Sequence, residues 1–72
     1  MEFETFIILL PIKIFERDKA ESIENTILTN LLDVDFIQDG GEAYRLSEFA
    51  DACNHQDIDL NNYWLTYVKA TI

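Results

Sequence analysis

The sequence predicts a single small domain of the α+β class. Residues 3–15 alternate with the period of a strand, and residues 17–33 repeat apolar side chains with the period of a helix. Residues 63–72 are dense in aromatic and β-branched side chains, which favour strands. The chain has 72 residues, 49% of them hydrophobic, which is enough for one core without a disulfide or a metal. We therefore expect residues 1–72 to form one domain.

The first strand is expected over residues 3–15. Its even-numbered positions form an unbroken apolar row, and this row defines the core face because alternate side chains of a strand share a face. The row consists of Phe6, Ile8, Leu10, Ile12 and Ile14. The opposite face carries Ile7 and Leu9, more apolar surface than one helix layer needs, so these two residues are the predicted interface of a homodimer. Pro11 cannot donate to a ladder, which predicts an edge, a bulge or a split strand.

The main helix is expected over residues 17–33. Its apolar residues recur at intervals of three and four, at Ala20, Ile23, Ile27 and Leu31. Asp18 is the predicted N-cap, with Glu21 three residues later as its partner in a capping box.

Residues 34–46 are expected to form a hairpin. Val34 and Phe36 alternate with polar residues, and the turn is predicted at Asp39, Gly40 and Gly41, because Asp-Gly followed by Gly supplies the positive φ angles of tight hairpin loops. A short helix then begins after Ser47 and ends near His55, and residues 63–72 form the last strand.

These elements follow the order β-α-β-β-α-β, the pattern of ferredoxin-like folds. In that fold both helices cover one face of a single antiparallel sheet. The alternative is a β-α-β-β-β sheet in which the short helix is only a surface turn.

The charge of the chain is strongly one-sided. It holds 14 acids against 5 bases, a net charge of −9. Between Asp33 and Asp59 the sequence contains eight carboxylates and a single cation, Arg45. The carboxylates are Asp33, Asp35, Asp39, Glu42, Glu48, Asp51, Asp57 and Asp59. Such a field favours a basic protein partner over nucleic acid or an anionic membrane. Solubility alone is the competing interpretation of this run.

No catalytic or metal-binding motif is complete, so we expect a non-enzymatic protein without cofactors. Asp57, Asp59 and Asn61 match the first ligands of a calcium loop, but Asn62 replaces its glycine and Val68 its final glutamate. The aromatics near the C-terminus lack the surrounding Lys and Arg of a nucleic-acid reader. Tyr63, next to carboxylates, is instead predicted to anchor a protein partner.

A cytoplasmic location is expected. Cys53 is the only cysteine, which fits a reducing compartment. The apolar run that begins at Phe6 is interrupted by Pro11 and Lys13, well short of the ~20 residues of a membrane span, and the acidic start of the chain is unlike a signal peptide.

The stretch LSEFADACNHQDIDLNNYW, residues 46–64, resembles small proteins of mobile elements. In size and acidity the whole chain also resembles phage and mobile-element inhibitors of the anti-CRISPR and antirestriction type, which mimic nucleic acid. This resemblance implies an inhibitor that docks on the basic surface of a protein that handles nucleic acid. The alternative is a small structural or assembly subunit that homodimerises through its first strand.

Overall fold

The structure, a computed structural model, describes residues 2–29 and 35–71. Within this part of the chain, the centre of the molecule is a four-stranded sheet with the order β2-β4-β1-β3. β1 is antiparallel to both β3 and β4, whereas β2 is parallel to β4, so the sheet is mixed. The strands are β1 (Phe3–Pro11), β2 (Ile27–Leu28), β3 (Glu42–Arg45) and β4 (Tyr63–Thr71).

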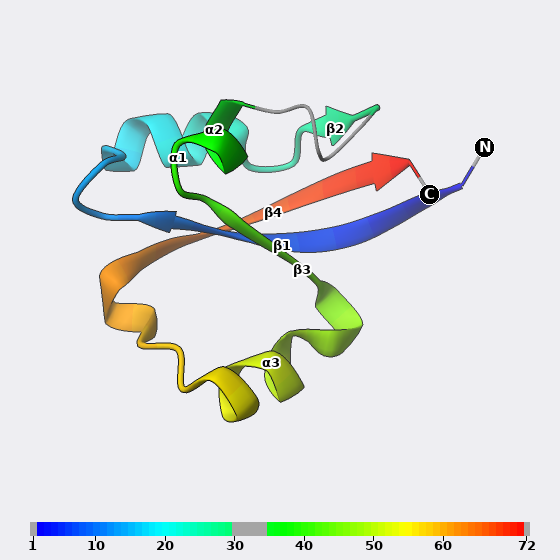
Figure 1. Cartoon of the computed structure of the whole chain (residues 1–72). Coiled ribbons are helices and arrows are strands. Elements are labelled where there is room, and N and C mark those ends of the chain that lie inside the picture. Colours follow the sequence, from blue (N-terminus) through cyan, green and yellow to red (C-terminus); the bar gives the residue numbers. More distant parts are fainter. Residues whose placement is uncertain (1, 30–34, 72) are drawn as a thin grey trace.

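Helices cover both faces of the sheet (Figure 1). α1 (Arg17–Ile23) and α2 (Asp35–Gln38) lie on one face, and α3 (Phe49–Gln56) lies on the other. The short 3-10 helices η2 (Leu46–Glu48) and η3 (Leu60–Asn62) flank α3. The predicted α+β class is confirmed. The ferredoxin-like order and its β-α-β-β-β alternative are wrong, because residues 27–28 form a strand where the sequence predicts a helix and residues 35–38 form a helix where it predicts a strand. The placement of both helices on one face is also wrong, since α3 lies on the face opposite α1.

The main core lies between the sheet and α1. It is built on side chains that share one face of β1 and β4, packed against the helix, and its buried members are Ile8, Leu10, Phe15, Ala20 and Val68. The predicted even-numbered row is thus correct as far as Leu10. Ile12 and Ile14 are exposed, because β1 ends at Pro11. The Pro11 carbonyl then accepts from the backbone N–H groups of Ile14 and Phe15, in a turn that leads into α1.

The predicted helix over residues 17–33 ends early, at Ile23. Asn25 has a positive φ of 64°, in the left-handed region that often terminates a helix. The next residues form β2, where Ile27 pairs with Lys69 of β4. The N-cap is Glu16, and Asp18 lies inside the first turn. Residues 30–33 of the predicted helix lie outside the described residues.

From Asp35 to Gln38 the first arm of the predicted hairpin is also helical, as α2, and Val34 lies outside the described residues. The N–H groups of Gly40 and Gly41 donate to the carbonyls of Ile37 (3.3 Å) and Phe36 (2.8 Å), which is the Schellman pattern of a helix end. Gly40 has φ 106°, and a Cβ on Gly41 would lie 2.5 Å from the Phe36 oxygen. Both glycines are therefore needed to end a helix. The second arm is a strand, β3, but it pairs with β1.

The second face of the sheet is covered only in part. Tyr44 of β3 lies opposite Ile7 of β1, and the Tyr44 ring packs on Phe49 of α3 with 6.1 Å between ring centroids. On this face Ile7 and Leu9 are 3% and 0% exposed. On the β4 side of the same face, Leu65 and Tyr67 remain 42% and 43% exposed.

Candidate functional site

Residues 46–62, which connect β3 to β4, form one excursion over the second face of the sheet (Figure 1). We call them the acidic segment. They contain four carboxylates and neither Lys nor Arg, so their net charge is −4 with His55 neutral. All four carboxylate side chains are exposed, and they are Glu48, Asp51, Asp57 and Asp59. The segment therefore presents charge of one sign to solvent.

Tyr44 attaches the acidic segment to the sheet. Its hydroxyl lies 3.1 Å from Gln56 Oε1, at the end of α3, and 3.1 Å from Glu42 Oε2. Because a hydroxyl has one proton, it donates to one of these acceptors at a time. Burial, and then the hydrogen bond to Glu42, raise the pKa of Tyr44 above its ordinary value. The hydroxyl therefore stays protonated and able to donate at neutral pH.

Two aspartates of the segment shape its backbone. Asp57 ends α3 with a positive φ of 52°, a conformation that Asp and Asn tolerate better than most residues. Asp59 caps η3, because its Oδ1 accepts from the Asn61 N–H at 3.0 Å. Its Oδ2 lies 3.4 Å from Asn62 Nδ2.

The rest of the predicted acidic surface is divided. Asp35 belongs to α2 and Asp39 follows it, so both lie on the α1 side of the sheet, opposite α3 (Figure 1). Glu42 is engaged by Tyr44, and Asp33 lies outside the described residues. The described part of the predicted run is thus not one surface, since the sheet lies between Asp39 and the acidic segment.

The other predicted contact residues differ in accessibility. Tyr63 is half-buried at the start of β4. Ile7 and Leu9 are buried within the chain, because α3 and its flanking turns occupy their face of the sheet. The structure therefore leaves these two side chains no surface with which to contact a second copy.

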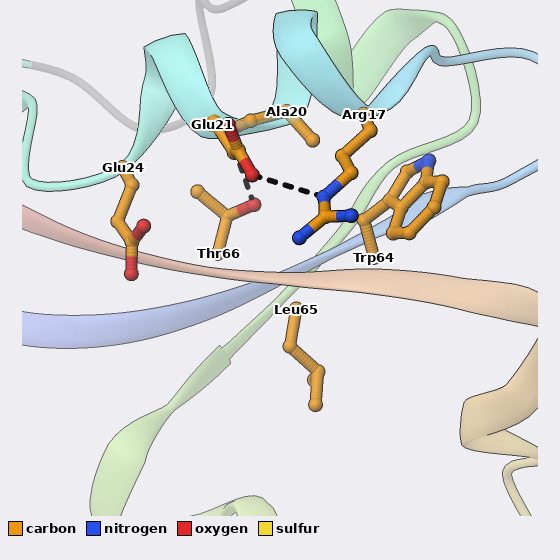
Figure 2. A pocket seen from close by; sticks show the side chains of 7 residues that line it. All are labelled: Arg17, Ala20, Glu21, Glu24, Trp64, Leu65 and Thr66. Atoms are coloured by element: carbon orange, nitrogen blue, oxygen red, sulfur yellow. Dashed lines mark hydrogen bonds and ion pairs between the residues drawn. The ribbon is translucent and has the colours of Figure 1, made fainter.

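Sequence reasoning missed a hollow between α1 and β4 (Figure 2). Its volume is about 170 Å³, and it is lined by Arg17, Ala20, Glu21, Glu24, Trp64, Leu65 and Thr66. The periodicity of residues 17–33 assigned a core face to the helix, but no local pattern indicates which strand edge lies beside it.

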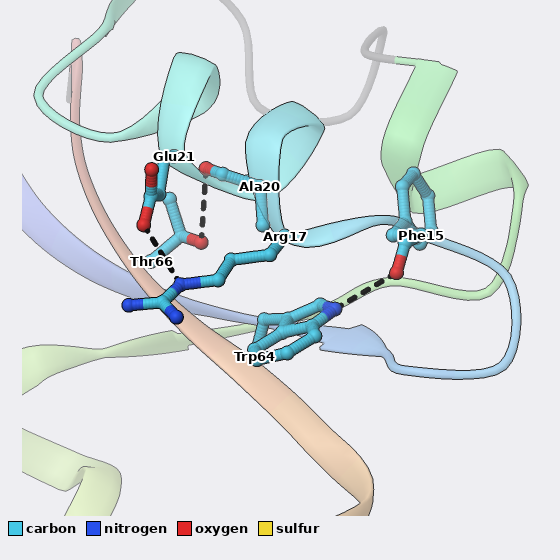
Figure 3. A network of polar contacts seen from close by, with 6 residues as sticks. All are labelled: Phe15, Arg17, Ala20, Glu21, Trp64 and Thr66. Atoms are coloured by element: carbon cyan, nitrogen blue, oxygen red, sulfur yellow. Dashed lines mark hydrogen bonds and ion pairs between the residues drawn. The ribbon is translucent and has the colours of Figure 1, made fainter.

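Two hydrogen bonds join β4 to α1 and to the turn that precedes it, beside this hollow (Figure 3). Trp64 Nε1 donates to the Phe15 carbonyl at 2.8 Å, and the buried Thr66 hydroxyl donates to the Ala20 carbonyl at 3.5 Å. On the open side, Arg17 Nε lies 3.0 Å from Glu21 Oε1. The indole is thus held in one orientation while the charged groups stay in solvent.

Within residues 2–29 and 35–71 we find no metal site, no disulfide and no membrane-spanning helix. No group of three or more His, Cys, Asp or Glu in these ranges is placed to hold a metal ion. Cys53 is half-buried and forms no disulfide. The helices of this part of the chain are too short to cross a membrane.

No protein-family model, curated protein or solved structure matches the chain. The resemblance to small inhibitor proteins therefore stays a prediction.

Proposed function

We propose that the chain is a non-enzymatic binding protein that docks through its acidic segment on a basic surface of another protein. One observation carries this proposal: residues 46–62 expose four carboxylates and no cation on a single excursion of the chain. Lys13, Arg17 and Lys19, three of the five basic residues, lie instead around α1. Residues 13–24, around α1, hold these three bases and four acids and so carry a net charge of −1, against −4 on residues 46–62, and this difference would orient a cationic partner toward the acidic segment.

A protein that handles nucleic acid is the class of partner that fits best. Its binding groove is lined with Lys and Arg side chains that ordinarily neutralise the phosphates of nucleic acid. Carboxylates on a folded protein surface can pair with the same side chains. The chain would then act as an inhibitor by excluding nucleic acid from the groove. A partner bound in this way should be released by salt, since the contact is electrostatic.

Amide variants test the proposal. The triple variant Glu48→Gln, Asp51→Asn, Asp57→Asn removes three charges from the acidic segment, and Asn is compatible with the positive φ at position 57. The matched control, Glu2→Gln, Glu16→Gln, Asp18→Asn, removes three exposed charges outside it. Each protein is used for affinity purification from the source cell with quantitative mass spectrometry.

The parent and the control should recover the same basic, nucleic-acid-handling partner, and the triple variant should recover at least tenfold less of it. Double-stranded DNA or RNA added in excess should compete for that partner. Recovery of only neutral or acidic partners, or equal recovery by the triple variant, would contradict the proposal.

A further inference from the structure

Among residues 2–29 and 35–71, no strand lies beside half of β4 on the side away from β1. Within the described residues, β2 pairs only with Lys69 and Ala70, at the C-terminal end of β4. The backbone just before β2 adds a bond from the Asn25 N–H to the Tyr67 carbonyl, at 2.7 Å. Residues 63–66 extend past this contact, so their outer edge is open.

The register identifies which backbone groups point to this edge. Lys69 donates its N–H to the Thr26 carbonyl at 3.0 Å, so Lys69, like Tyr67, directs its backbone groups away from β1. Because alternate residues of a strand direct their N–H and C=O to the same side, Leu65 does so as well. The N–H and C=O of Leu65 and the N–H of Tyr67 therefore have no backbone partner within the described part of the chain, and an added strand could pair with them.

This edge lacks the devices that usually prevent strand pairing. Residues 63–67 read Tyr-Trp-Leu-Thr-Tyr, without a charge, a proline or a glycine. Natural edge strands are commonly blunted by Lys, Pro or a bulge, and aromatic and β-branched residues favour pairing. The edge is thus suited to accept an extended chain.

The α1 side of the edge is anionic. The hollow of about 170 Å³ beside the edge is smaller than the roughly 300–1,000 Å³ of small-molecule pockets, so it suits a single side chain. Glu21 and Glu24 line it against one cation, Arg17, which already pairs with Glu21 (Figure 2). A cationic side chain complements this side.

The opposite side of the edge is apolar along residues 65–67, and the exposed Lys69 follows on the same face beside β2. Leu65 and Tyr67 project there with more than two fifths of their surfaces exposed, and Ile27 of β2, paired with Lys69, is 63% exposed. An apolar side chain on an added strand would cover Leu65 and Tyr67.

We propose that an extended segment of another protein, in which basic and apolar residues alternate, adds to the sheet beside residues 63–67. Because side chains of a strand alternate between faces, its basic residues would lie beside Glu21 and Glu24 and its apolar residues beside Leu65 and Tyr67. This strand addition goes beyond the proposed function, since it uses a different surface and does not require the acidic segment.

A displayed library of random octapeptides is the probe. Selection against the parent protein should enrich peptides in which Lys or Arg alternates with apolar residues. The variant Leu65→Pro deletes one outward N–H while sparing the bonds to β1, and Leu65→Val is the matched control that keeps it. Enriched peptides should bind Leu65→Pro at least tenfold more weakly than Leu65→Val and should slow hydrogen exchange of the Leu65 and Tyr67 amides.

A second variant tests the proposal even if Leu65→Pro does not fold. The double reversal Glu21→Lys, Glu24→Lys alters only exposed side chains and should shift the selected peptides from basic to acidic alternation. The proposal is overturned if no peptide is enriched, if enriched peptides show no alternation, or if the reversal leaves the preference unchanged. A dimer that Leu65→Pro dissolves would assign the edge to a second copy instead. The amide variant of the acidic segment should bind these peptides normally, which separates this proposal from the proposed function.

Discussion

At the scale of single residues, Tyr44 joins parts of the chain that are distant in sequence. Its ring packs on Phe49 and its hydroxyl reaches Gln56, so both ends of α3 contact one side chain of β3. Because α3 packs mainly on β3 and η2 among the described elements, we infer that Tyr44 of β3 sets the position of the acidic segment.

Tyr44→Phe should lower the free energy of unfolding by about 0.5–1 kcal/mol. It removes the hydroxyl but keeps the ring, and water can replace an exposed hydrogen bond, so the cost falls in the lower part of the usual range. Urea denaturation measures the loss. Tyr67→Phe is the matched control, because Tyr67 is exposed and its hydroxyl makes no hydrogen bond to the described residues. An equal effect of both substitutions would contradict the role of Tyr44.

The raised pKa of Tyr44 also predicts a pH dependence. A pKa that is higher in the folded protein than the ordinary value of 10.0 means that folding favours the protonated phenol. Its contribution is present below pH 10 and is lost as pH rises through the folded-state pKa. Denaturation curves between pH 9 and 11 should therefore show the parent losing its advantage over Tyr44→Phe. If the stability of the parent and of Tyr44→Phe changed in parallel with pH, this contribution of the Tyr44 hydroxyl would be ruled out.

At the scale of elements, Gly40 and Gly41 decide what the chain does between α2 and β3. The positive φ of Gly40 ends the helix, and the buried Gly41 lets the following backbone approach Phe36 closely. A hairpin turn and a Schellman helix end both require glycine, so the same sequence signal supports either.

Gly41→Ala should destabilise the fold by at least ~2 kcal/mol. The new methyl group would lie 2.5 Å from the Phe36 backbone oxygen, which cannot rotate away as a side chain can, and 3.2 Å from Leu10 Cδ2. Thermal or urea denaturation measures the effect. The control Gln38→Ala, at an exposed position of the same helix, should change stability by less than ~0.5 kcal/mol. A Gly41→Ala protein as stable as this control would refute the close contact.

At the scale of the whole molecule, a net charge of −9 is carried on a body of 34 × 27 × 18 Å. The Debye length is about 30 Å at 0.01 M salt and about 10 Å at 0.1 M. At low salt every carboxylate therefore repels the others across the molecule, whereas at higher salt the repulsion is confined to neighbours.

Stability should consequently rise with salt. Between 10 mM and 300 mM NaCl the melting temperature should increase by several degrees, because screening relieves the repulsion. The increase should be smaller in the triple amide variant of the acidic segment than in the triple amide control, since Lys13, Arg17 and Lys19 already offset the charges near α1. A melting temperature independent of salt would contradict this account.

The fold could be predicted wherever the sequence pattern is compatible with only one type of secondary structure. The alternating residues of β1 and β4 and the helical spacing around Ala20 each match a single period, and both strands and α1 are present. Among the described residues, prediction failed at 24–29 and 35–41. There Asn25 and the two glycines permit a helix end or a turn, and contacts with β4 and β1 choose between them.

For the candidate site, the sequence by itself determined the number and sign of the charges, the absence of cations from residues 46–62 and the strand-forming character of residues 63–67. Only the tertiary structure decided which carboxylates share a surface, that Ile7 and Leu9 are covered, and that one edge of β4 is open. The physical reason is that charge and propensity belong to single residues, whereas faces and edges arise from pairing between strands far apart in the chain.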